Sequence, residues 1–205
     1  MSHNLELLFP TPVAFFDLGF EMTEEEKSFL LNQEKIPNDG NKSSKENYLL
    51  DKPEMVRLSN RVQECVTEYA TEVWKADIQA YVTQSWLNWT KPGQYHHRHA
   101  HPNSLYSGVL YIDVKDDRDR ITFYQNRYEQ MKPTYKEWNR WNSESWWLPV
   151  RTGGIVLFPS GLTHMVETVP GEVIGKERVS LAFNTFAKQI GDNKGLTELV
   201  PRHFS

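Results

Sequence analysis

Three histidines occupy alternate positions in this sequence, His97, His99 and His101, directly after the turn Lys91-Pro92-Gly93. Residues two apart in a strand point to the same face of a sheet. His99 and His101 can therefore reach one point in space, and a later strand can bring His164 to it. Neutral imidazoles suit Fe(II), Zn, Ni or Cu better than Mg or Ca, which prefer oxygen ligands.

The spacing thus predicts a metal site formed by His99, His101 and His164 inside a β-barrel. The alternative is that these histidines cluster on the surface by chance or pack in the core as hydrogen-bonded residues. The other four histidines lack this combination of turn, strand and spacing, and no metal role is assigned to them: His3, His96, His97 and His203.

The helices that must support such a barrel are expected in the first part of the chain. Thr23 and Glu26 form a capping box that predicts a helix running towards Gln33. Residues 37–47 are polar and rich in turn-forming residues, which indicates a loop. Hydrophobic residues three or four apart then predict a long amphipathic helix over residues 53–73, with Cys65 in its buried face.

The strands are expected mainly after Ala80, where short runs rich in β-branched and aromatic residues alternate with turns. They cover residues 81–89, 105–114, 121–124, 155–158 and 178–186, and an opening strand is expected over residues 8–16, where its prolines fit an edge position. Helices first and strands afterwards predict an α+β domain, a jelly-roll barrel braced by N-terminal helices. We expect one domain over residues 1–205, with helical support at about 20–80 and the barrel core at about 81–190.

Composition excludes several functional classes. The 205 residues carry a formal net charge of −4, which gives no electrostatic case for binding nucleic acid or an anionic membrane. The single cysteine excludes an intrachain disulfide framework and fits a reducing compartment. No secretion signal or bilayer-spanning apolar stretch is visible. We therefore expect a cytoplasmic protein without nucleic-acid or membrane partners.

Three stretches of the chain resemble a family of Fe(II)- and 2-oxoglutarate-dependent oxygenases found in bacteria and marine phages: residues 92–111, 158–164 and 178–184. The resemblance covers roughly residues 84–186, and a weaker similarity is present at Leu8–Val13. It implies a cupin-like double-stranded β-helix, Fe(II) as cofactor, 2-oxoglutarate as cosubstrate, and the host cytoplasm as location if the chain is phage-encoded.

The chain departs from the pattern of that superfamily at one position. Similar oxygenases carry His-x-Asp or His-x-Glu, then a distal histidine, then an arginine on the next strand. His99 and His164 match the two histidines, but His101 stands where a carboxylate is usual. The third ligand could therefore be His101, Asn103 or a water molecule.

Arg178 and Ser180 form the second informative group, because they share one strand face with Ala182 and Asn184. An unpaired buried charge is costly unless the group meets a partner. Similar oxygenases use an Arg-x-Ser pair to bind the distal carboxylate of 2-oxoglutarate, and Tyr111 can add a hydroxyl. The resemblance thus implies cosubstrate binding by Arg178, Ser180, Tyr111 and Asn184. The alternative is an Arg178 that pairs with an internal carboxylate such as Asp113.

The segment from Gln125 to Leu148 is too long for a plain hairpin loop and is rich in aromatic residues: Tyr128, Tyr135, Trp138, Trp141, Trp146 and Trp147. Long loops in compact domains are usually functional or disordered, and this composition argues against disorder. It predicts a lid or substrate platform over the metal site. The alternative is that the rings pack against the N-terminal helices or a second subunit, which leaves a homodimer open.

The function expected is an oxygenase that hydroxylates an unknown small-molecule or peptide substrate and releases succinate and CO2. The same spacings also fit the general pattern of cupins, which include metal enzymes and binding modules that do not use 2-oxoglutarate. Cupins usually carry a glutamate shortly after the second histidine, but residues 102–108 contain no acid. A third alternative is a barrel with a structural role in a phage or its host, which need bind neither metal nor 2-oxoglutarate.

Overall fold

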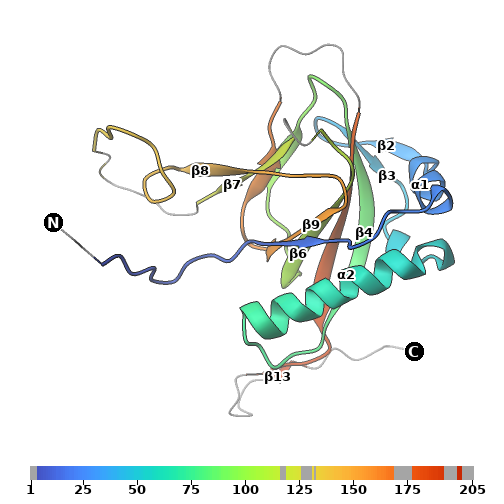
Figure 1. The fold of residues 1–205 in the computed structure, drawn as a ribbon, viewed down its shortest axis with the longest axis horizontal. Helices are drawn as coiled ribbons and strands as arrows, with labels where there is room; N and C mark the ends of the chain where they lie inside the picture. Colours follow the sequence, from blue (N-terminus) through green and yellow to red (C-terminus); the bar gives the residue numbers. More distant parts are fainter. Residues whose placement is uncertain are drawn as a thin grey trace.

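The computed structural model describes residues 4–115, 119–125, 131, 133–168, 177–191 and 198–199, and in this part of the chain two antiparallel sheets face each other (Figure 1). The larger sheet has seven strands, in the order β1 (Ala14–Asp17), β9 (Gly154–Pro159), β6 (Tyr106–Asp113), β11 (Arg178–Ala187), β4 (Ala80–Thr90), β3 (Lys42–Ser44) and β2 (Lys35–Pro37). The smaller sheet has four, in the order β5 (His96–His99), β10 (His164–Val166), β7 (Arg120–Tyr124) and β8 (Ser145–Pro149). A short ladder joins β12 (Ile190–Gly191) to β13 (Glu198–Leu199). The predicted α+β jelly-roll barrel, a double-stranded β-helix, is confirmed.

Helices cover the outer face of the larger sheet. They are α1 (Glu24–Leu31), the short 3-10 turns η1 (Leu49–Asp51) and η2 (Pro53–Met55), and α2 (Val56–Glu68), which continues into a π-helical turn over Tyr69–Val73. Helix α2 lies across the sheet in Figure 1. None of the helices in the described ranges is long and apolar enough to cross a bilayer.

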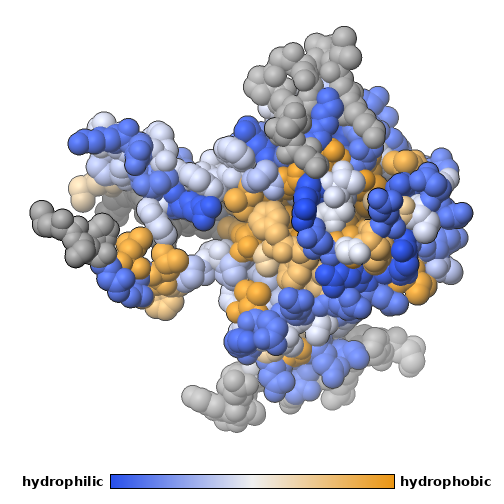
Figure 2. Space-filling view, in the orientation of Figure 1, coloured by the Kyte–Doolittle hydropathy of each residue, from blue (hydrophilic) through white to orange (hydrophobic). Residues whose placement is uncertain are grey.

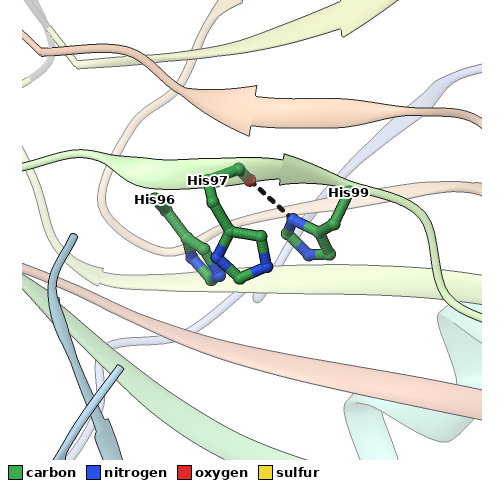
Figure 3. Close-up of side chains that lie close together, drawn as sticks. All are labelled: His96, His97 and His99. Carbon is green, nitrogen blue, oxygen red and sulfur yellow. Dashed lines mark hydrogen bonds between the residues drawn. The ribbon is translucent and has the colours of Figure 1, made fainter. Parts of the chain in front are cut away.

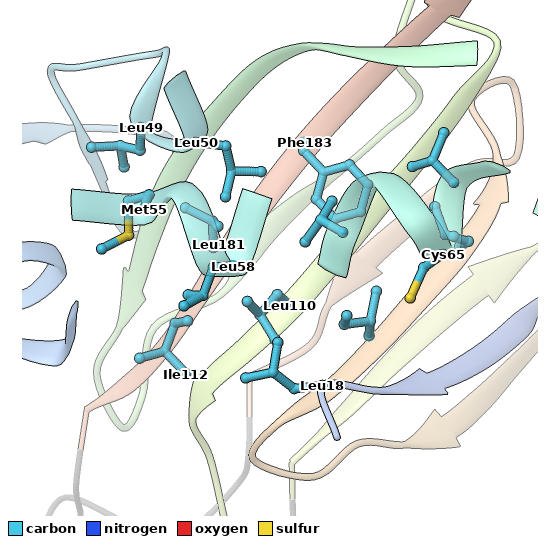
Figure 4. Close-up of a cluster of buried hydrophobic side chains, with 14 of the residues drawn as sticks. Leu18, Leu49, Leu50, Met55, Leu58, Cys65, Leu110, Ile112, Leu181 and Phe183 are labelled. Carbon is cyan, nitrogen blue, oxygen red and sulfur yellow. The ribbon is translucent and has the colours of Figure 1, made fainter. Parts of the chain in front are cut away.

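The main hydrophobic core lies between these helices and the larger sheet (Figure 4). On β11, Val179, Leu181 and Phe183 point into it, as the alternation in the sequence predicts. The thiol of Cys65 is free and fully buried there, and burial raises its pKa to about 11. Cys65 is therefore a core residue, as expected, and poorly reactive.

A second core fills the space between the two sheets, where Tyr111, Phe123 and Phe158 meet. Gly108 on β6 leaves room for the ring of Phe183, its partner on β11. A Cβ at this position would lie 2.1 Å from that ring. Residues of β11 that point away from the helices, among them Arg178 and Ser180, face this inner space. The sandwich thus has an apolar core beneath the helices and, between the sheets, a pocket lined by both polar and apolar residues.

Two expectations about local structure were wrong. The opening strand begins only at Ala14, because Pro10 and Pro12 lack the amide hydrogens that a ladder needs. The stretch expected as a loop contains β3 and the last residue of β2, and this short hairpin extends the larger sheet next to β4. Its residues are polar because this hairpin forms the sheet edge.

Candidate metal centre

The two short strands β5 and β10 pair antiparallel, and this pairing sets His164 directly opposite His99. His101 lies two residues beyond the end of β5, where its backbone N–H donates to the carbonyl of Ser160 at 2.9 Å. A ligating nitrogen from each of His99, His101 and His164 lies within 4.8 Å of the others. The structure thus brings together the three histidines named from the sequence.

Hydrogen bonds orient each of these rings through its Nδ1 atom. His99 Nδ1 contacts the carbonyl of His97 at 2.7 Å, and His164 Nδ1 contacts the carbonyl of Leu162 at 3.0 Å. His101 Nδ1 lies 2.6 Å from the amide oxygen of Asn184. Because each acceptor is an oxygen, each Nδ1 carries the proton and each Nε2 keeps a lone pair for a metal.

The arrangement of these lone pairs is the test of whether a metal ion fits. His99 Nε2 and His101 Nε2 face each other at 2.9 Å. With both protons on Nδ1, two acceptor atoms point at each other, which is unfavourable without a cation between them. A separation of this size is also what two adjacent ligands about 2.1 Å from one metal ion would have. The donor set therefore fits a transition-metal ion such as Fe(II) or Zn.

Burial keeps these imidazoles neutral. It lowers the pKa of His99 to about 4, and it lowers the pKa of the nearly fully buried His164 well below the ordinary value. Burial also lowers the pKa of His101, partly offset by its hydrogen bond to Asn184. Neutral imidazole is the form that binds metal, so these rings need no proton loss at neutral pH before they ligate.

A pocket between the sheets extends from the histidines to Arg178 and is lined by Trp86, Asn88, His96, His99, His101, Val109, Tyr111, Ile121, His164, Met165, Val166, Arg178, Ser180 and Ala182. Arg178 is buried, and its guanidinium donates to the carbonyl of Arg120 at 2.8 Å. Among the described residues no carboxylate forms an ion pair with Arg178. The pairing with Asp113 considered from the sequence does not form.

Tyr111 borders the same end of the pocket. Its ring centroid lies 5.2 Å from the guanidinium carbon of Arg178, and its buried hydroxyl has no hydrogen-bond partner among the residues that the structure describes. Burial raises the pKa of Tyr111 to about 12, so the hydroxyl stays protonated and can donate. Arg178, Ser180 and Tyr111 together leave donors available to an anion in the pocket.

Asn184 and Asn103 lie elsewhere than the sequence suggested. The amide oxygen of Asn184 accepts from His101 Nδ1 and, at 2.9 Å, from the hydroxyl of Ser107, so Asn184 supports the metal centre instead of lying beside Arg178. Asn103 is exposed in a turn with a left-handed backbone (φ 57°). His101 contacts the two other histidine rings, which favours it over Asn103 as third ligand.

The prediction from the sequence missed several residues of the pocket wall, among them Trp86, Asn88 and His96. Trp86 and Asn88 lie two apart on β4, and the register places Asn88 opposite Ser180. A polar residue between Leu87 and Trp89 on a buried strand was the available signal for Asn88. His96 has no such signal, because an irregularity in β5 brings it to the face that carries His99 (Figure 3).

The aromatic segment connects β7 to β8, and the part of it that the structure describes extends away from the barrel (Figure 1). Trp138 and Trp141, beyond its paired strands, are 67% and 60% exposed. These two rings therefore do not pack against the helices, which was one alternative. Tyr128 lies outside the described residues, as do His3 and His203.

Comparison with protein families gives one match. The model of a family described as "Putative 2OG-Fe(II) oxygenase" matches residues 84–184, about half of the chain. The matched region runs from β4 to β11 and includes all three histidines and Arg178. A comparison with curated protein sequences found no match.

Solved structures share the fold at low sequence identity. An oxidoreductase of the 2OG-Fe(II) oxygenase family from Burkholderia pseudomallei is 12% identical, with a TM-score of 0.59 over 84% of this chain and 83% of its own. HygX from Streptomyces hygroscopicus is 13% identical, with a TM-score of 0.58 over 85% and 82%. A prolyl-4-hydroxylase from Pseudomonas putida is 13% identical, with a TM-score of 0.55 over 85% and 92%.

These likenesses establish the barrel, and the family match covers the strands that carry the histidines and the arginine. The chain belongs to the family of 2OG-Fe(II) oxygenases.

Proposed function

We propose that this protein is a non-haem Fe(II)- and 2-oxoglutarate-dependent oxygenase that hydroxylates a small-molecule or peptide substrate and releases succinate and CO2. The observation that carries the proposal is the position of Arg178. This buried cation has no carboxylate partner among the described residues and lines the same pocket as three neutral imidazoles. A pocket with a metal-binding end and an anion-binding end suits a ligand that chelates metal and carries a second carboxylate.

His99, His101 and His164 would hold the metal, and their Nδ1 hydrogen bonds keep the Nε2 atoms directed at it. Bound Fe(II) supplies the centre at which 2-oxoglutarate and O2 react. Since all three ligands are neutral, the centre keeps one more unit of positive charge than a site with a carboxylate would. This excess charge favours binding of the 2-oxoglutarate dianion.

Arg178, Ser180 and Tyr111 would bind the distal carboxylate of 2-oxoglutarate. Arg178 is held by the carbonyl of Arg120 and supplies charge, while the hydroxyls of Ser180 and Tyr111 can donate hydrogen bonds. Apolar side chains of Val109 and Ile121 line the pocket and exclude water from the reacting centre. The structure of HygX with nickel and 2-oxoglutarate bound, on a barrel of the same fold, supports this use of the pocket.

The proposal extends to the remaining expectations. A cytoplasmic location is supported by the single, buried cysteine. One functional domain is supported by the match, which joins strands from both sheets. The exposed aromatic hairpin of β7 and β8 is a candidate lid or platform for the substrate, and its exposed tryptophans also leave room for contact with a second copy of the chain.

Substitution of Arg178 by alanine tests the proposal. Arg178→Ala should weaken 2-oxoglutarate binding by at least about 2 kcal/mol, the scale of a lost charge-assisted pair in a buried site. The measurement is anaerobic calorimetric titration of the Fe(II)-loaded protein with 2-oxoglutarate. Iron content and the circular dichroism spectrum should be unchanged.

Arg151→Ala is the matched control, because Arg151 is exposed and pairs with Asp17 on the surface. It should leave 2-oxoglutarate affinity at the wild-type value. Equal affinity in Arg178→Ala and wild type would contradict the assignment of Arg178. A wild-type protein that binds metal but no 2-oxoglutarate would instead favour a cupin-type metal protein.

A further inference from the structure

A second group of histidines lies beside the first, entirely on β5. Ligating nitrogens of His96, His97 and His99 lie within 4.8 Å of one another. The three rings hang from the same side of the strand in Figure 3, with ring centroids 4.6 to 5.1 Å apart. No metal role was assigned to His96 and His97 from the sequence, and on a regular strand His96 would point away from the face of His97 and His99.

An irregularity in the pairing of β5 explains why these side chains gather. His99 stands opposite His164 and His96 stands opposite Val166, so three steps along β5 correspond to two along β10. An extra residue of this kind is a β-bulge, which changes the direction of the side chains around it. The bulge thus brings His96 to the side of the strand that carries His97 and His99.

His97 supplies an independent sign that a ligand belongs here. Its Nδ1 atom is buried and has no hydrogen-bond partner among the described residues. A buried ring nitrogen without a partner costs free energy that a ligand can recover. His96 lines the pocket next to His99, with the two rings stacked at 4.8 Å.

We propose that His96, His97 and His99 form a second binding position for a divalent transition-metal ion. Three imidazoles and no carboxylate suit Zn, Ni or Cu(II) better than Mg or Ca. The position is separate from the centre formed with His101 and His164, and it does not depend on the oxygenase reaction.

The two positions exclude each other because they share His99. Hydrogen bonding to the carbonyl of His97 occupies Nδ1 of His99, so this ring has one nitrogen left for a metal. A metal ion bound with His96 and His97 therefore removes a ligand from the centre of His101 and His164. Binding at either position weakens binding at the other.

The test uses zinc alone and a variant without the first centre. His101→Ala/His164→Ala should still bind one zinc ion per chain, measured by competition with a chromophoric chelator. Adding His97→Ala to this variant should abolish that binding. Adding Asn103→Ala instead, at an exposed turn residue outside the cluster, is the control and should leave it unchanged.

Two outcomes overturn the proposal: a folded double variant that binds no zinc, and zinc binding that survives the loss of His97. If the double variant lacks the wild-type circular dichroism spectrum, His101→Gln/His164→Gln replaces it, because glutamine preserves more of the side-chain volume.

The wild type gives an independent check, since it should bind one zinc ion tightly per chain. Two tightly bound ions would show that His99 is not shared. Failure of this test would leave the Arg178 experiment, and with it the oxygenase assignment, unaffected.

Discussion

Among the described residues, the ring of His101 has more hydrogen-bond partners than the rings of the other two histidines of the metal centre. Its Nδ1 contacts Asn184 at 2.6 Å and the hydroxyl of Ser107 at 2.9 Å, while its ring lies 5.7 Å from that of Trp86. Ser107 in turn bonds to Ser160, at the turn before His164. These bonds join the larger sheet to the metal centre, so a residue beyond the end of β5 is positioned as firmly as one within it.

This geometry predicts which residue completes the metal centre. His101→Ala should lose tight Fe(II) binding, because two imidazoles rarely hold a divalent ion in an open site. Asn103→Ala should keep near-stoichiometric iron, since Asn103 is exposed in a turn. Anaerobic iron analysis measures this in the two purified variants, each made together with His97→Ala so that the position formed by His96, His97 and His99 is lost. Full loading of the first variant and loss in the second would show that the wrong residue was chosen.

Much of the metal centre could be predicted from residue types and spacing. Period-two alternation related His99 to His101, and a later strand supplied His164. The same rule failed at His96, because nothing in the sequence marks the bulge that turns its side chain inward. The contact of Asn184 with His101 could not be predicted from the sequence either, since it depends on which end of β11 lies next to His101.

At the scale of elements, one carboxylate connects both helices. The backbone N–H of Thr23 donates to Glu26, and the hydroxyl of Thr23 accepts from the Glu26 amide, which is the capping box expected from the sequence. The guanidinium of Arg57 on α2 donates to both carboxylate oxygens of Glu26, at 3.0 and 2.7 Å. The cap of α1 and its attachment to α2 therefore depend on the same charge.

Removing that charge should destabilise the protein in a pH-dependent way. Hydrogen bonds from Arg57 hold the pKa of Glu26 below its ordinary value of 4.5. A depressed carboxyl pKa stabilises the fold above the unfolded pKa, and the benefit is lost as pH falls through the folded pKa. Glu26→Gln should therefore cost roughly 1 to 2 kcal/mol of unfolding free energy at pH 7.

Urea unfolding of both proteins at pH 7 and at a series of pH values below 4.5 measures the effect. The difference between them should shrink as the pH falls. Glu24→Gln is the control, because Glu24 is exposed and its ion pair with Lys27 is a surface contact. A cost for Glu26→Gln that does not change with pH would place the effect in packing instead of charge.

Elements with a strong local signal were predicted well. The capping box marks the start of α1, and the hydrophobic periodicity marks α2, although the last turn is π-helical. The hairpin of β2 and β3 was missed because the polar residues of β3 form a strand only through pairing with β4 and β2. Strand β8 was missed for a related reason, since its charged and aromatic surroundings resemble a loop until β7 pairs with it.

At the scale of the whole molecule, two parts extend beyond the barrel. One is the hairpin of β7 and β8, and the other is the N-terminal segment before β1 (Figure 1). The N-terminal segment carries exposed hydrophobic side chains, among them Leu8 and Phe9. Figure 2 shows apolar groups on the part of the surface where this segment lies. Apolar side chains that gather on an exposed surface often mark a site where a ligand or partner binds.

The exposed rings of the hairpin should therefore matter for turnover and not for stability. Trp138→Ala and Trp141→Ala should each change the melting temperature by no more than about 2 °C, as expected for surface positions. Trp89→Ala, at a ring that is 1% exposed, is the contrasting control and should lower it by about 10 °C. Thermal unfolding followed by circular dichroism measures both effects. Unfolding of the two hairpin variants would mean that these rings belong to a core, and the lid or platform would be excluded.

The pairing of β5 with β10 has a consequence for the order of events in folding. His99 and His164 are separated by most of the barrel sequence. A metal ion can therefore bind both side chains only after the chain between them has closed into a loop. Metal should therefore leave the refolding rate unchanged and slow unfolding, by about 100-fold when free metal is about 100 times its Kd. Stopped-flow refolding and unfolding in urea, with and without zinc, separates the two rates. Faster refolding with zinc would mean instead that the histidines already meet in the unfolded chain and that the metal guides the barrel to closure.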